Sequence, residues 1–166
     1  MRRYLSAFGP ASVRDIQAWS GLTRMAEAFE ELRGELRVFY DESGTELFDV
    51  PDGPLPGPDT PAPPRVLPNY DNVLLGHRDR SRIVPSAPAA PMLPGHEADR
   101  GSVLVDGYLA GLWKRERSGR DVTMRIDLGW PIRRRDERAL RQEAERALAF
   151  IEPKASTRTV VITYRG

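Results

Sequence analysis

The stretch SVRDIQAWSGLTRMAEAFEELR, residues 12–33, contains two short helical patterns separated by the turn-forming pair Ser20–Gly21. Ser12 and Asp15 have the spacing of a capping box, in which each residue satisfies an otherwise unpaired backbone N–H at the start of a helix. The second pattern places apolar side chains at i, i+3, i+4 and i+7, the periodicity of a helix with one buried face. These residues are Met25, Ala28, Phe29 and Leu32. The stretch therefore predicts a helix-turn-helix.

The flanking residues extend this motif to a larger unit. Residues 2–8 predict a further helix, Thr23 has the residue type of an N-cap for the third helix, and Gly34 stands where a C-terminal glycine cap belongs. Residues 36–40 and 45–49 flank an Asp-Glu-Ser-Gly turn and predict a β-hairpin. Three helices followed by a hairpin is the order of elements in a winged helix.

The remainder of the chain predicts a different architecture. Residues 51–68 contain eight prolines, which indicates an extended connector. Beyond it, β-patterns dominate and one helical pattern precedes the last strand: the expected strands are 102–105, 108–116, 121–128 and 158–164, and the helix spans about 136–150. We therefore predict an α+β protein with a winged helix domain over 1–50, a Pro-rich connector over 51–68 and a β-rich domain over 69–166.

Charge is distributed unevenly along the chain. Residues 1–50 carry a net charge of −3, residues 51–100 a net charge of −1, and residues 101–166 a net charge of +5. The outward face of the third helix would hold Arg24, Glu27, Glu30 and Glu31. Phosphates would repel three carboxylates, so we expect this helix to be a packing element rather than a reader of the DNA major groove.

Two clusters of arginine are candidates for contacts with a polyanion. Arg78, Arg80 and Arg82 alternate within GHRDRSR, a spacing that projects side chains to one side of an extended segment and suits successive phosphates. An equally weighted alternative is a solvated loop in which Asp79 neutralises one arginine. Arg133, Arg134 and Arg135 precede the last helix, where a charged linker is the alternative. DNA-binding residues are therefore predicted at Arg78, Arg80, Arg82, Arg133, Arg134 and Arg135.

Motifs of other chemistries are mostly missing from the sequence. It has no cysteine, and His77 and His96 do not have metal-ligand spacing, so we expect neither a metal nor another cofactor. The sequence has no apolar run long enough to span a membrane, and a cytoplasmic location is expected. Asp71 has the chemistry of a catalytic base, but a turn that caps a strand over 73–75 is the favoured interpretation. Trp19, Trp113 and Trp130 are interpreted as core rather than as stacking platforms for bases; for Trp113, which lies on a strand beside Lys114 and Arg115, stacking is kept as the alternative.

Three blocks of the sequence resemble a known family. RRYLSAFGPASVRDIQAWSGL, LPNYDNVLLGHRDRSRIV and VLVDGYLAGLWKRE are similar, in this order, to the C-terminal half of bacterial winged helix DNA-binding domain proteins. That family includes DNA glycosylases of the azinomycin-resistance type, which excise alkylated purines and unhook interstrand crosslinks. The resemblance implies tandem winged helices packed against a barrel-like β-domain around a DNA channel, with double-stranded DNA as the partner.

One departure from the family pattern limits what the resemblance implies for catalysis. Glycosylases of this family carry a Gln-x-Gln or Gln-x-Asp motif, in a region N-terminal to the part resembled here. The two glutamines of this chain, Gln17 and Gln142, do not form such a motif, so no catalytic residue is assigned. We expect a short or truncated member that associates with DNA without glycosylase activity of its own. The alternatives are a compact glycosylase that uses Asp71, and a protein–protein scaffold that binds a separate N-terminal winged-helix half or another partner.

Overall fold

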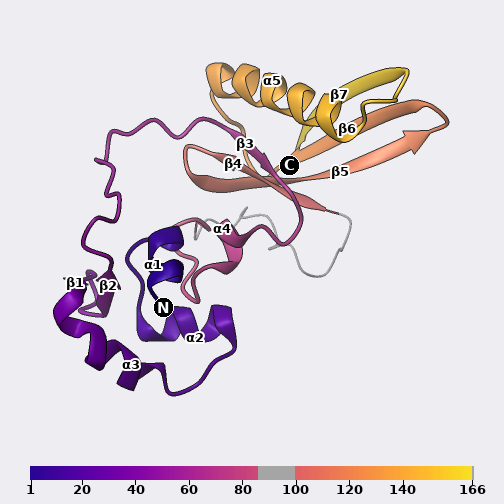
Figure 1. Cartoon of the computed structure of the whole chain (residues 1–166). Coiled ribbons are helices and arrows are strands. Elements are labelled where there is room, and N and C mark those ends of the chain that lie inside the picture. Colours follow the sequence, from indigo (N-terminus) through magenta and orange to yellow (C-terminus); the bar gives the residue numbers. More distant parts are fainter. Residues whose placement is uncertain (86–99, 166) are drawn as a thin grey trace. The chain divides into compact units, whose positions relative to one another are not determined.

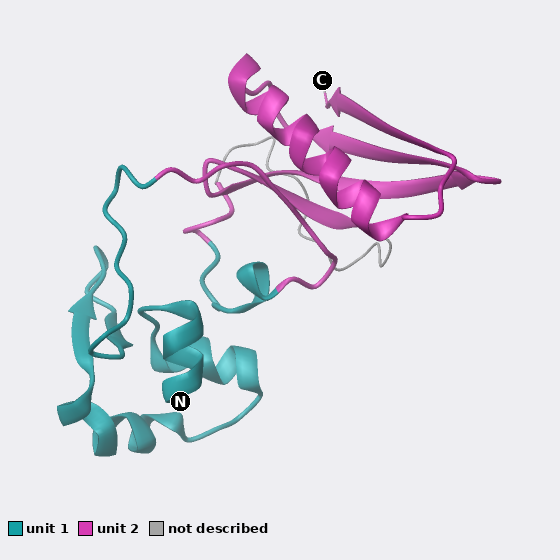
Figure 2. Ribbon diagram, turned by 45° about the horizontal axis from the view of Figure 1, so that its top comes forward, with its two compact units in different colours: residues 1–60, 72–80 teal, residues 61–71, 81–166 magenta. Residues whose placement is uncertain are grey.

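The computed structural model describes residues 1–85 and 100–165, which form two compact units. The first unit comprises Met1–Thr60 and Asn72–Arg80, and the second comprises Pro61–Asp71 and Ser81–Gly166 (Figures 1 and 2). The chain therefore leaves the first unit, enters the second, and returns to the first before its final passage into the second. His96 lies outside the described residues, as do Pro88, Pro91 and Pro94.

Helices and one hairpin build the first unit. Its elements are α1 (Arg2–Phe8), α2 (Val13–Ser20), α3 (Met25–Leu32), a 3-10 turn (Arg33–Glu35), the antiparallel strands β1 (Arg37–Tyr40) and β2 (Glu46–Asp49), and α4 (Asn72–Leu75). A backbone pair between Ala11 and Phe48 joins the loop before α2 to β2. The buried core lies between the helices and the hairpin and consists of Tyr4, Leu5, Ala11, Ile16, Phe29 and Phe48.

The helix boundaries follow local sequence chemistry only in part. The capping box of α2 is confirmed, because Ser12 Oγ accepts from the Asp15 N–H and Asp15 accepts from the Ser12 N–H. The prediction that Thr23 caps α3 is wrong: the N-cap is Arg24, which has a left-handed φ of 59° and no side-chain cap. Gly34 lies inside the 3-10 turn that follows α3 rather than at a glycine C-cap.

The predicted strand over 73–75 is a short helix, α4. The Gly76 N–H donates to the Asn72 carbonyl at 2.7 Å, which closes a single helical turn. Only Leu74 of this turn is buried, so its three consecutive apolar residues do not mark a strand with a buried face. A run of three residues is too short to distinguish the periodicity of a helix from that of a strand.

The second unit is a five-stranded sheet covered by one long helix. Its strands are β3 (Arg65–Leu67), β4 (Gly101–Val105), β5 (Tyr108–Ser118), β6 (Asp121–Leu128) and β7 (Thr157–Tyr164), in the spatial order β3-β4-β5-β6-β7. Neighbouring strands are antiparallel except β6 and β7, which are parallel because α5 (Arg134–Ile151) connects them. Asp106 and Gly107 both have positive φ, as a two-residue hairpin turn of type I′ requires. β3 lies within the proline-rich stretch.

The sheet is open, so the expected barrel-like shape is wrong. β3 and β7 are opposite edges of the described sheet and do not pair with each other. The three-residue β3 is short, and α5, rather than a closing strand, covers the apolar face (Figure 1). Val122, Met124 and Ile126 from β6 pack there with Leu140, Ala144 and Leu148 from α5.

Trp19 is 44% exposed, so its expected place in the core is wrong, whereas Trp113 contributes to the core of the second unit. Trp113 packs against the core cluster, and its indole Nε1 donates to the Leu67 carbonyl at 2.8 Å. The hydrogen bond ties β5 to the edge strand β3 across β4. The ring therefore has a structural role in the second unit.

Candidate nucleic-acid interface

The six predicted DNA-binding arginines are divided between the two units. Arg78 and Arg80 belong to the first unit, whereas Arg82 and the cluster Arg133–Arg135 belong to the second. Arg78 and Arg82 are exposed, Arg80 is half-buried, and all three arginines of the 133–135 cluster are exposed. The sequence alone gave no sign that the GHRDRSR stretch crosses from one unit to the other between Arg80 and Ser81.

The segment that bears Arg78 is anchored to α1 and α2. The Tyr4 hydroxyl donates to the Gly76 carbonyl at 2.5 Å, and the Trp19 indole donates to the Asn72 side chain at 3.3 Å. Gly76 also lies against the Phe8 ring, since a Cβ at this position would be 2.6 Å from Phe8 Cδ1. These contacts join residues more than fifty positions apart in the sequence.

Asp15 provides a further anchor for this segment. Its side chain accepts the backbone N–H of Arg78 at 2.9 Å and is only 5% exposed. Burial acts to raise the pKa of the Asp15 carboxyl, but hydrogen bonds from Ser12 and from the Arg78 backbone, with the nearby His77, together hold the pKa below its usual value. Asp15 is therefore a carboxylate in the folded protein at neutral pH.

The guanidinium groups of Arg78 and Arg80 are not neutralised within the described part of the chain. Neither side chain forms an ion pair with a carboxylate among residues 1–85 and 100–165. Because two unpaired cations close together in sequence repel each other, an anion placed between them would be stabilised. Phosphate is the anion that nucleic acids supply at such a spacing.

In contrast to Arg78 and Arg80, the arginines at the two ends of the acidic helix α3 are bound to carboxylates. Arg24 forms a bidentate pair with Glu27, and Arg33 pairs with both Glu30 and Glu46. The hydrogen bond with Glu46 is the largest cause of a raised pKa for Arg33, which is therefore firmly a cation. Glu27 and Glu30 thus compensate the cations at the two ends of α3, and α3 offers no excess positive charge to DNA.

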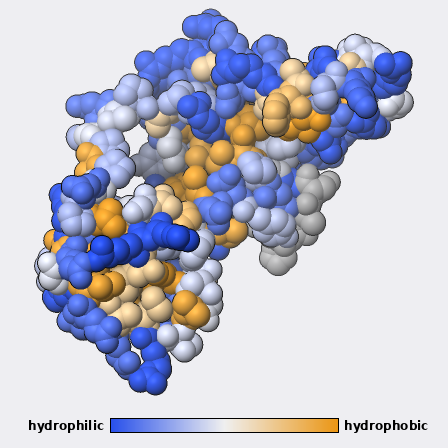
Figure 3. Space-filling view, viewed as in Figure 1, coloured by the Kyte–Doolittle hydropathy of each residue, from blue (hydrophilic) through white to orange (hydrophobic). Residues whose placement is uncertain are grey.

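The second basic cluster lies at the start of α5. Arg133 is the N-cap residue, and the helix begins at Arg134, two residues before the predicted start. Arg135 lies 3.5 Å from Asp136, whereas Arg133 and Arg134 form no ion pair with the described residues. Because the helix includes Arg134, Arg138 lies one turn further along the same face; it is also exposed and forms no ion pair with residues 1–85 or 100–165. Figure 3 shows a predominantly hydrophilic surface over α5.

Sequence reasoning missed Arg138 as a member of this cluster. The i, i+4 spacing from Arg134 was the signal that could have identified it, but only with the helix start placed correctly.

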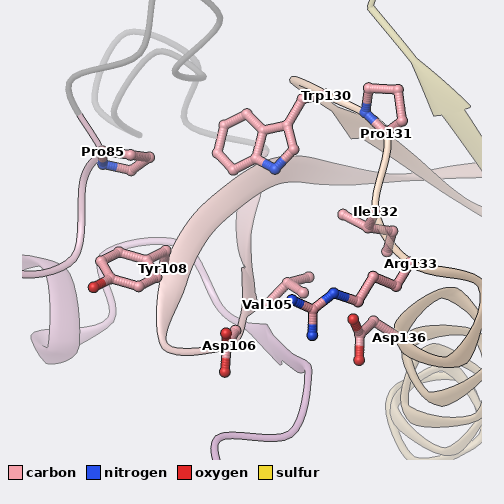
Figure 4. Close-up of a pocket in the computed structure, with 9 residues that line it drawn as sticks. All are labelled: Pro85, Val105, Asp106, Tyr108, Trp130, Pro131, Ile132, Arg133 and Asp136. Carbon is pink, nitrogen blue, oxygen red and sulfur yellow. The ribbon is translucent and has the colours of Figure 1, made fainter.

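An open pocket of about 340 Å³ adjoins this cluster. Arg133 lines it together with Val105, Asp106, Tyr108, Trp130 and Asp136, as well as Pro85, Pro131 and Ile132 (Figure 4). In this view the Arg133 side chain extends toward Val105 and Asp106. The pocket therefore combines one guanidinium group, two carboxylates and two aromatic rings, and Tyr108 is 48% exposed.

Several other basic residues of the second unit are paired with carboxylates. Arg115 and Arg117 from β5 both bind Glu152, which is 8% exposed and ends α5. Lys114 and Arg125 bind Glu116, and the hydrogen bond from Arg125 is the largest cause that lowers the pKa of the Glu116 carboxyl. Several of the arginines that give the C-terminal part its net positive charge are thus bound to carboxylates within the fold.

Two further expectations concern metals and membranes. Among the residues that the structure describes, no group of three or more His, Cys, Asp or Glu residues could hold a metal ion. Within the same residues, no helix is long and apolar enough to cross a membrane. His77 lies edge-on to the Phe8 ring at a centroid distance of 6.3 Å, in the anchored segment rather than in a cluster of ligands.

Comparisons with known proteins give one family and one fold. Residues 1–150 match the model of the family described as DNA glycosylase AlkZ-like. In a search of solved structures, the chain matches the Streptomyces sahachiroi DNA glycosylase AlkZ with a TM-score of 0.61 and 19% sequence identity. The match covers 99% of this chain and 44% of that one, so the chain spans less than half the length of the solved relative. No curated protein matches the chain.

Proposed function

Because the chain belongs to the AlkZ-like DNA glycosylase family, we propose that it binds the phosphate backbone of double-stranded DNA through the unpaired arginines of its two units. Arg78 and Arg80 are the contacts from the first unit. Arg133 and Arg134 are the unpaired contacts from the second, with Arg138 added as the next unpaired residue on the same face of α5, while Arg135, which lies 3.5 Å from Asp136, remains a predicted contact. Arg82, which also lies in the second unit, is likewise kept as a predicted contact.

The observation that carries this proposal is the division of the arginines into two classes. Many guanidinium groups of the fold are bound to carboxylates, as Arg115 and Arg117 are to Glu152. Four of the six predicted DNA-binding arginines form no ion pair within the described chain. An exposed, unpaired guanidinium group has its full charge available and releases a condensed counterion from DNA when it binds a phosphate.

We assign the first unit to the winged-helix type, with α1, α2 and α3 as its helices and β1–β2 as its hairpin. In this proposal α3 packs the hairpin instead of entering the major groove, since Glu27, Glu30 and Glu31 would face the phosphates. Affinity would then come mainly from phosphate contacts, and discrimination between DNA sequences would be weak.

Fluorescence anisotropy with a labelled duplex at several salt concentrations tests the proposal. We expect binding at low salt, with log K falling linearly as log salt concentration rises. The double variant Arg78→Ala/Arg80→Ala should flatten this slope by about 1.8, because each phosphate contact contributes about 0.9. Arg24→Ala is the matched control, since Arg24 is exposed but already neutralised by Glu27. Absence of binding at low salt, or equal effects of the two variants, would overturn the proposal.

We further propose that this chain alone does not release a base. The family is named for DNA glycosylases, but neither Gln17 nor Gln142 lies in a Gln-x-Gln or Gln-x-Asp motif. The test is incubation with duplex DNA that contains 7-methylguanine, followed by quantification of the free base. Release above background would favour a compact glycosylase, and Asp71→Asn would then show whether Asp71 is its base. Release only after addition of an N-terminal winged-helix half would identify that half as a protein partner.

A further inference from the structure

Asp15 makes one more contact than a helix cap requires. In a capping box, the acidic side chain reaches back to the N-cap residue. Here Asp15 Oδ2 accepts both the backbone N–H of Ser12 at 2.8 Å and the Ser12 hydroxyl at 2.7 Å. The other oxygen, Oδ1, accepts the backbone N–H of Arg78 at 2.9 Å, across 63 positions of sequence. A single buried carboxylate thus joins the first turn of α2 to the segment that bears the unpaired arginines.

The carboxylate does not act alone on this segment. The Tyr4 hydroxyl binds the Gly76 carbonyl, two residues before Arg78, and Tyr4 itself is 4% exposed. Gly76 lies so close to the Phe8 ring that a side chain at this position would have to displace the ring. The backbone is therefore fixed at Gly76 and at Arg78, although 76–80 contains no helix or strand.

Such anchoring changes the energetics of binding. An arginine on a free loop must lose backbone freedom as well as side-chain freedom when it binds a phosphate, and this loss offsets part of the electrostatic gain. A backbone that is already fixed loses only the side-chain part. Asp15 is only 5% exposed and is a carboxylate, which a phosphate would repel, so any favourable influence on affinity must pass through the residues that it holds.

We propose that Asp15 is a positioning residue that fixes the backbone of Arg78 and thereby holds the guanidinium groups of Arg78 and Arg80 in place for adjacent DNA phosphates. The inference rests on the proposed function for the choice of ligand, but the anchor itself is independent of DNA. Tyr4 supports the same segment from α1. The expected consequence is that two variants with similar damage to the α2 cap differ in DNA affinity.

Ser12→Ala provides the matched control for Asp15→Ala. Both variants remove one side chain of the same capping box, but Ser12→Ala leaves Asp15 Oδ1 in place to accept from Arg78. Hydrogen exchange measured by NMR on the free protein tests the anchor directly: the Arg78 amide should be protected in the wild type and in Ser12→Ala, and should lose its protection in Asp15→Ala. Equal protection of this amide in all three proteins would overturn the inference whatever the DNA measurements show.

Measurements of duplex binding then test whether the contact between Asp15 and the Arg78 backbone increases DNA affinity. Asp15→Ala should weaken binding on the order of tenfold at low salt, the equivalent of one charge-assisted hydrogen bond, whereas Ser12→Ala should stay within about twofold of the wild type. In the Arg78→Ala/Arg80→Ala background, Asp15→Ala should have no additional effect. The same loss in both backgrounds would mean that Asp15 acts through general folding, and would overturn the inference while the proposed function stands. A wild type that binds no DNA would instead refute the proposed function.

Discussion

The pairing of Glu152 with two arginines makes a quantitative prediction about the second unit. Glu152 ends α5 and is nearly buried, while Arg115 Nη1 lies 2.8 Å from its carboxylate and Arg117 binds the same group. Removing one partner of a fully buried pair costs about 3–5 kcal/mol, and an exposed pair contributes about 0–1 kcal/mol. The side chains of Arg115 and Arg117 are 44% and 51% exposed, so water takes over part of the lost interaction. We therefore expect Glu152→Gln to lower the free energy of unfolding by about 1–3 kcal/mol.

Urea denaturation followed by tryptophan fluorescence measures this loss, since Trp113 and Trp130 both lie in the second unit. Glu145→Gln is the control, because Glu145 is on the same helix, is exposed, and forms no ion pair with the described residues. The control should change stability by less than about 0.5 kcal/mol. DNA binding should not weaken in Glu152→Gln, since no phosphate contact is removed. Equal stability of the two variants would refute the claim that the ion pairs of Arg115 and Arg117 with Glu152 stabilise the second unit.

Two further predictions concern packing and pH. Gly101→Ala would place a methyl group too close to Trp113 Nε1. The resulting overpacking, with loss of the hydrogen bond from Trp113 to Leu67 of β3, should lower the free energy of unfolding by about 2–4 kcal/mol, measured by thermal unfolding. The control Gly34→Ala should lose no such stability, because a methyl group at Gly34 meets open space. The lowered pKa of Asp15 contributes stability that is complete above the unfolded value of about 3.9 and disappears as pH falls through the folded value. Melting temperatures between pH 6 and pH 3 should therefore fall less steeply in Asp15→Asn than in the wild type, and parallel curves would contradict this role.

Local sequence patterns predicted the elements whose chemistry lies within a few residues. The Asp106–Gly107 turn needs two residues with positive φ, and this pair is among the few that adopt them readily. The strand over 121–128 has its buried residues at every second position, as expected for a sheet with one covered face. The capping box of α2 was equally recognisable, because both of its members lie within one helical turn.

Features that depend on distant partners could not be predicted. The expected strand at 73–75 is a helix whose segment packs on α1 and α2, and no pattern near Gly76 reveals the Phe8 ring against it. The role of Asp15 beyond its cap depends on a backbone amide 63 residues away. The open shape of the sheet depends on α5 covering one face, whereas the barrel was expected from a resemblance alone.

The sequence identifies candidate arginines by residue type, but it does not show the environment of each one. The sequence identified clusters of arginine, and Arg78, Arg80, Arg133 and Arg134 are indeed unpaired within the described chain. It did not show that Arg115 and Arg117, which are equally basic, are bound to Glu152. Whether a guanidinium group is neutralised is decided by tertiary contacts, which charge counts along the chain do not contain.

The most direct test compares two pairs of arginines in the second unit, one pair without carboxylate partners among the described residues and one pair bound to Glu152. The salt dependence of duplex binding should be measured for Arg134→Ala/Arg138→Ala and for Arg115→Ala/Arg117→Ala, with folding of both variants checked by circular dichroism. Our account predicts that the first variant flattens the slope of log K against log salt concentration by about 1.8 and that the second leaves it unchanged. An equal change in both variants would show that binding follows total charge rather than unpaired arginines, and would contradict the central claim.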